Sequence, residues 1–144
     1  AAILSSLPLD FVARFKVGGT HLNFFIAEQL PVIAPDCLAL APDWTQGETI
    51  GSWLWGRLGA LIGLSADGRR GGLSPADREP GSGERATMRA EIDAAFFLLY
   101  GLDRAEVDYI LDTFPIVRRK DEAEFGEYRT KRLILEKYDE FAGV

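Results

Sequence analysis

The segment Met88-Arg-Ala-Glu-Ile-Asp-Ala-Ala-Phe-Phe-Leu-Leu-Tyr-Gly101 indicates the fold class of this chain. Its apolar residues recur at the three- and four-residue spacing of an α-helix, and a glycine such as Gly101 commonly ends one. The pattern therefore predicts a long helix with one strongly buried face. The residues of that face are Met88, Ile92, Ala95, Phe96 and Leu99.

Apolar patterns on both sides of this segment predict four more helices. Pro8 is acceptable in the first turn of the first of them, with Ser5 or Ser6 as its cap, and Asp103 with Glu106 forms a capping pair for another. These helices are expected near residues 4–15, 50–62, 104–111 and 127–141.

Two stretches interrupt the helical pattern. Thr113-Phe-Pro-Ile116 breaks it because the residue before a proline is disfavoured in the α region. Residues 20–34 contain apolar pairs followed by prolines, which predicts a short strand, a turn of helix and an extended exit. The expected fold is mainly α, a small helical domain with a minor β element near residues 20–34.

A polar segment divides the chain. Residues 65–85 are rich in Gly, Pro, Ser, Asp and Arg and have no periodic apolar positions, which predicts a flexible linker. It would connect residues 1–64 to a helical tail formed by residues 86–144.

Composition excludes several classes of site. The chain has 144 residues, enough for one domain, and a net charge of −6 argues against a self-sufficient nucleic-acid-binding module. Because Cys37 and His21 are the only cysteine and histidine, an internal disulfide framework and a His/Cys zinc site are excluded. No Ser/His/Asp or Cys/His arrangement and no phosphate-binding glycine loop is recognisable, so no catalytic residue is expected.

The N-terminus and the hydropathy of the chain suggest its cellular compartment and its relation to a longer protein. No signal peptide is visible, and the most apolar stretch, Ile50–Leu64, is too short for a membrane span and contains Arg57. A cytoplasmic protein without membrane contact is expected. The chain begins Ala1-Ala-Ile-Leu4, without methionine and within an apparent helix, which suggests a fragment of a longer protein.

The first candidate binding cluster is Arg14-Phe-Lys-Val-Gly-Gly-Thr-His-Leu-Asn23. Glycines permit close approach to a ligand, and Arg and Asn are common readers of base edges in DNA. The alternative is an ordinary helix C-cap. The DNA-contact candidates in this cluster are Arg14, Lys16, Thr20, His21 and Asn23.

The second candidate cluster lies in the tail and is more basic. Its residues would suit phosphate contacts in a larger protein. The alternative is a salt-bridged surface, because acidic residues are interleaved with them. The candidates are Arg118, Arg119, Lys120, Arg129, Lys131 and Arg132.

Four segments of this chain together resemble parts of one known protein family. Phe11-Val-Ala-Arg-Phe-Lys-Val-Gly-Gly-Thr-His-Leu-Asn-Phe-Phe25, continued by Glu28-Gln-Leu-Pro-Val32, resembles the end of the target-recognition region in adenine-specific DNA methyltransferases of restriction–modification systems, including type IIG-like enzymes. Three later segments resemble the C-terminal tail of the same proteins. They are Arg89–Leu102, Tyr109–Asp121 and Gly126–Asp139.

The resemblance implies a non-catalytic C-terminal fragment that contributes to DNA target recognition or positioning. Such methyltransferases bind S-adenosylmethionine and hold the extruded adenine in a separate domain with a Pro-Pro-aromatic motif, and this chain has no Pro-Pro pair. The implied partners are double-stranded DNA, through the full-length protein, and the methyltransferase domain of the same chain. No cofactor is expected in this chain itself. The alternative is a structural scaffold that packs against the methyltransferase domain or a partner subunit without touching DNA.

Overall fold

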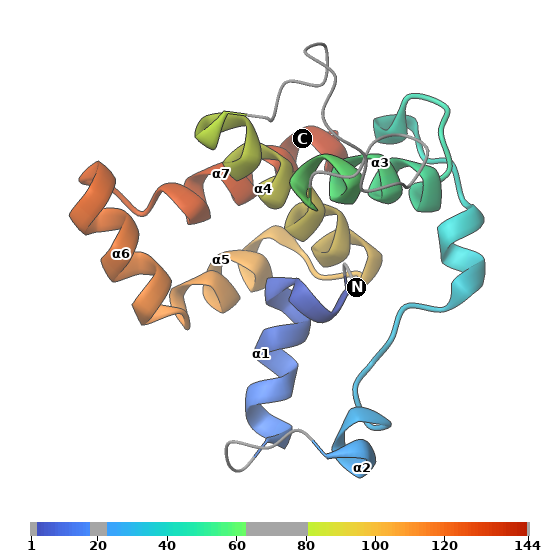
Figure 1. The fold of residues 1–144 in the computed structure, drawn as a ribbon, viewed down its shortest axis with the longest axis horizontal. Helices are drawn as coiled ribbons and strands as arrows, with labels where there is room; N and C mark the ends of the chain where they lie inside the picture. Colours follow the sequence, from blue (N-terminus) through green and yellow to red (C-terminus); the bar gives the residue numbers. More distant parts are fainter. Residues whose placement is uncertain (1–2, 18–22, 63–80, 144) are drawn as a thin grey trace.

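The computed structural model describes residues 3–17, 23–62 and 81–143, and these residues are mainly helical (Figure 1). The expected mainly α fold is therefore confirmed. The α-helices are α1 (Leu7–Lys16), α2 (Phe24–Ala27), α3 (Ile50–Ile62), α4 (Ser82–Leu99), α5 (Arg104–Asp112), α6 (Pro115–Phe125) and α7 (Arg129–Ala142). Three short 3-10 helices accompany them, η1 (Ile3–Ser5), η2 (Pro35–Ala39) and η3 (Asp43–Thr45).

Helix α4 is the centre of the fold and packs most extensively against α7. One side of α4 carries Ala90, Ala94 and Phe97 into a core shared with α5 and α7. Alanine side chains keep the facing helix close, and Ala94 and Phe97 have no solvent exposure. The other members of this core are Val107, Ile110, Leu111, Phe114, Ile134 and Tyr138.

The other side of α4 forms a second core with α3. It contains the predicted stripe residues Ile92, Ala95 and Phe96, which pack with Ile50, Trp53 and Leu54 of α3. Because α4 is buried on two sides, it joins the segments before and after the glycine-rich region. Helix α3, before that region, and helices α5 and α7, after it, thus share α4 as a packing surface.

An aromatic cluster closes the second core at the C-terminal end of α7. The rings of Trp44 and Phe141 are stacked, with centroids 4.8 Å apart and an interplanar angle of 20°. Trp53 meets both rings edge-on, at centroid distances of 5.0 Å from Trp44 and 5.8 Å from Phe141. This cluster ties η3 and α3 to α7.

The structure differs from the sequence-based expectation in residues 20–34. The described part, from Asn23 onward, contains no strand, so the predicted minor β element is corrected there to a helix. Asn23 accepts a hydrogen bond from the backbone N–H of Ile26 at 2.9 Å and so starts α2, and this local cap favours a helical turn. Residues 18–22 lie outside the described residues.

Two boundaries also differ from those expected. Helix α4 begins at Ser82, inside the predicted linker, because the carboxylate of Glu84 accepts a hydrogen bond from the Gly81 N–H at 2.9 Å. The earlier part of that linker, up to residue 80, lies outside the described residues. The predicted break near Pro115 is present, but it is followed by α6, which the apolar pattern did not predict.

Candidate functional site

Arg14 lies where α1 meets the junction of α5 and α6. Its guanidinium donates to the carboxylate of Asp10 at 2.6 Å and to the backbone oxygen of Thr113 at 3.4 Å. The same group lies 4.1 Å from the centre of the Phe114 ring. The structure thus places Arg14 of the first candidate cluster next to Phe114, the residue before α6.

The other residues of the first cluster are placed differently. Asn23 is exposed, and its side-chain oxygen is occupied as the N-cap of α2. Lys16 is exposed at the end of α1, and no carboxylate in the described part of the chain forms an ion pair with it. Thr20 and His21 lie outside the described residues, so their predicted roles are not placed.

Two cations of the second cluster, Arg118 and Lys131, are neutralised within the protein. Arg118 pairs with Glu122 at 2.7 Å, and this hydrogen-bonded contact raises the pKa of Arg118. Lys131 reaches Asp112 at 2.8 Å and Asp108 at 3.0 Å. Burial lowers the pKa of Lys131, but its hydrogen bonds to the two aspartates outweigh this and raise it. These contacts match the salt-bridged alternative for this part of the surface.

Arg132 and Arg129 also contact other side chains of the protein. Arg132 pairs with Glu127 at 3.0 Å and with Glu136 at 2.8 Å, and these hydrogen bonds raise its pKa. The guanidinium of Arg129 lies 4.5 Å from the centre of the Phe125 ring. The contact with Phe125 is a cation–π interaction, and no carboxylate in the described ranges forms an ion pair with Arg129.

Arg119 and Lys120 are exposed on α6, and within residues 3–17, 23–62 and 81–143 neither forms an ion pair. They follow Arg118 near the middle of the helix, and Asp121, Glu122 and Glu124 come after them. Because the effect of the helix dipole is confined to the first and last turns, it acts little on either cation.

A shallow groove between α5 and α7 contains two of the predicted residues, Lys131 and Arg132. Its volume is about 350 Å³, and five carboxylates pair with the three cations Arg104, Lys131 and Arg132 along it. Burial, followed by the nearby carboxylates Asp121 and Asp112, raises the pKa of Tyr128 in this groove to about 12. The tyrosine stays protonated and donates to the backbone oxygen of Leu111 at 2.9 Å. Excess carboxylate makes the groove a poor phosphate site.

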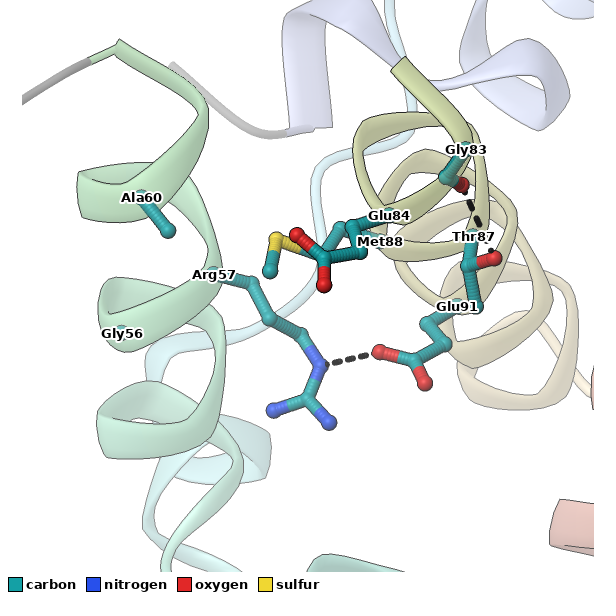
Figure 2. Close-up of a pocket in the computed structure, with 8 residues that line it drawn as sticks. All are labelled: Gly56, Arg57, Ala60, Gly83, Glu84, Thr87, Met88 and Glu91. Atoms are coloured by element: carbon teal, nitrogen blue, oxygen red, sulfur yellow. Dashed lines mark hydrogen bonds and ion pairs between the residues drawn. The ribbon is translucent and has the colours of Figure 1, made fainter. Parts of the chain in front are cut away.

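A larger open groove, of about 670 Å³, lies between α3 and α4 (Figure 2). Figure 2 shows Arg57 of α3 and Glu91 of α4 pointing toward each other, and their side chains pair at 2.6 Å. Arg57 also lies 3.7 Å from the centre of the Trp53 ring, and Glu91 meets Lys137 at 3.6 Å. Sequence reasoning missed this ion pair, although a single arginine within the apolar α3 segment was a signal that an acidic partner faces it.

The described residues contain neither a three-ligand metal cluster nor a helix fit to span a membrane. No group of three or more His, Cys, Asp or Glu side chains that could hold a metal ion occurs in the described ranges. None of the helices in those ranges is long and apolar enough to cross a membrane. No protein-family model, curated protein or solved structure matches the chain.

Proposed function

We propose that this chain is a non-catalytic C-terminal helical part of an adenine-specific DNA methyltransferase of the restriction–modification type. In this role it helps to position double-stranded DNA, while another domain binds S-adenosylmethionine and carries out the reaction in the cytoplasm. The proposal starts from the segments that resemble such enzymes, and the geometry of α6 supports it.

The observation that carries the DNA-positioning role is that Arg119 and Lys120 pair with no carboxylate in the described part of the chain. None of the α6 side chains is fully buried, and α6 lies at the edge of the molecule in Figure 1. Both cations are exposed and are therefore available to the phosphates of a polyanion such as DNA.

A structural scaffold is the second candidate, and a different observation favours it. Phe24 and Phe25 of α2 are 79% and 70% exposed, and Phe15 near the end of α1 is 76% exposed. Adjacent large aromatic side chains in water are unusual and suit burial against another protein surface. A methyltransferase domain or partner subunit covering α2 would bury them.

A titration of fluorescently labelled duplex DNA with this chain tests the DNA-positioning role. At low ionic strength we expect a rise in anisotropy that shrinks as salt is added, because phosphate contacts release counterions. The net charge of −6 keeps this binding weak. No anisotropy change at any salt concentration would leave the scaffold as the remaining function.

The non-catalytic role has its own test. Incubation of this chain with duplex DNA and radiolabelled S-adenosylmethionine is expected to transfer no methyl group. Transfer above the level of a protein-free reaction would contradict the proposal, whatever the outcome of the binding experiment.

A further inference from the structure

We infer that the described part of this chain contacts the phosphate backbone of duplex DNA through Arg119 and Lys120 of α6 and reads no bases. This inference rests on the proposed function and specifies its chemistry. It separates a positioning surface from a sequence-reading one, which the amino-acid sequence alone left open.

The guanidinium of Arg14, the first candidate for reading a base, already binds other groups of the protein. Reading guanine requires the two parallel donors of a guanidinium to face O6 and N7 of the base. The guanidinium of Arg14 instead donates to Asp10 and Thr113 and lies over the Phe114 ring. Releasing it would break the contact between α1 and the start of α6.

Asn23, the second candidate for reading a base, is engaged as well. Recognition of adenine by asparagine uses the side-chain oxygen and nitrogen together. The oxygen of Asn23 accepts the Ile26 N–H as the N-cap of α2, an interaction worth about 0.5–2 kcal/mol. Base reading by Asn23 would therefore compete with formation of α2.

Arg119 and Lys120 have the opposite character. They are exposed, and no neighbouring side chain in the described ranges holds either in a fixed geometry. A phosphate contact needs charge within reach and little else, whereas base reading needs a side chain fixed by its surroundings. These two cations therefore suit phosphates.

The test compares salt dependence and sequence dependence of binding. The double variant R119Q/K120Q removes both unpaired cations, and R104Q/R132Q makes the same change in net charge at two paired arginines. Each protein is titrated against two duplexes of equal length and base composition but unrelated sequence. The measured quantities are the affinity and the slope of log K against log salt.

For the unaltered chain we expect the two duplexes to bind equally, within about twofold. R119Q/K120Q is expected to reduce the magnitude of the salt slope by about 2, because each lost phosphate contact contributes about 0.9. R104Q/R132Q should change the slope by clearly less. Circular dichroism of both variants should match that of the unaltered chain, since all four side chains are exposed.

Three results would overturn the inference. A tenfold preference for one duplex that disappears in N23A or R14Q would show base reading, and the proposed function would stand. If the two double variants changed the salt slope equally, the proposed function would stand, but Arg119 and Lys120 of α6 would not be the residues that contact phosphate. Binding to polyglutamate and not to DNA would identify an acidic protein as the partner, and the DNA-positioning role would fall as well.

Discussion

The carboxylate of Asp93 on α4 accepts a hydrogen bond from the backbone N–H of Leu7, the first residue of α1, at 2.8 Å. The side chain of Ser6, the N-cap residue, accepts no hydrogen bond from the first turn of α1. The acceptor for the Leu7 N–H is instead Asp93, 86 positions away in the sequence. The contact fixes α1 to α4 and so places Arg14 at the start of α6. Burial raises the pKa of Asp93 to about 7, although the Leu7 N–H and the charge of Arg89 act in the opposite direction.

This pKa predicts that stability falls as pH rises through the acidic range. Asp93 binds its proton more tightly in the folded chain than in the unfolded chain, where its pKa is near 3.8. Its stabilising contribution is therefore complete below about pH 4 and is lost as pH rises to about 7. We expect a loss on the order of 4 kcal/mol, measured by urea unfolding across this range.

Two substitutions at Asp93 separate the charge from the hydrogen bond. Asp93→Asn keeps an acceptor for the Leu7 N–H and removes the titration, so its stability curve should be flatter between about pH 4 and 7. Asp93→Ala should be less stable than Asp93→Asn by about 1 kcal/mol, because the N–H loses its partner. An unchanged pH dependence in Asp93→Asn would show that other groups cause it.

The stack of Phe141 on Trp44 predicts a cost for truncating the ring. Phe141→Ala should destabilise the chain by about 1–3 kcal/mol, since the half-buried ring packs against two tryptophans. Tryptophan emission should shift to longer wavelength as water reaches Trp44 and Trp53. Chemical unfolding and fluorescence spectra measure these two effects.

Phe25→Ala is the matched control for Phe141→Ala. The Phe25 side chain is 70% exposed, so its removal should change stability by no more than about 0.5 kcal/mol and leave the emission spectrum unchanged. If the two variants were equally destabilised, the aromatic cluster would not hold α7 to η3.

Replacing either of two glycines of α3 by alanine should change the stability of the chain by different amounts. A methyl group on Gly56 meets no atom within 4 Å, whereas one on Gly51 comes within 3.2 Å of the backbone oxygen of Leu38. Gly56→Ala should stabilise the chain by about 1 kcal/mol through helix propensity. Gly51→Ala should stabilise the chain clearly less, because η2 must move to make room for the added methyl group. Thermal unfolding of both variants tests this order, and a larger gain at Gly51 would contradict it.

The N-cap of α5 predicts a further stability change. Asp103 accepts the Glu106 N–H at 2.9 Å, and Glu106 accepts the Asp103 N–H at 2.8 Å. Asp103→Ala should cost about 0.5–2 kcal/mol, while Asp103→Asn should cost less because asparagine also caps helices. Urea unfolding of the two variants distinguishes a cap from a simple charge effect, for which they would be equal.

Local signals in the sequence predicted most of the helices. The stripe from Ile92 to Phe96 has the period of a helix, and the Asp103/Glu106 pair is a cap that can be read without any tertiary information. Helix α6 was missed because none of its side chains is fully buried and it has no apolar stripe. Its local signals were Pro115 at the start and Gly126, with φ of +75°, at the end.

Side-chain contacts between helices could not be predicted in the same way. The pairing of Arg118 with Glu122 follows from their four-residue spacing on one helix, so the sequence by itself determines it. The pairing of Lys131 with Asp108 and Asp112 exists because α7 packs on α5, 19 or more residues away. Local spacing determines which side chains share a helix face, but only packing determines which faces meet.

The same distinction applies to the candidate site. The sequence determined which segments are basic, because that depends on composition alone. The neutralisation of Lys131 depends on tertiary packing, which brings Asp108 and Asp112 of α5 to it, whereas no carboxylate among the described residues reaches Arg119 or Lys120. Tertiary packing also decided that Arg14 meets Phe114, a contact across 100 residues that arises because Asp93 holds α1 against α4.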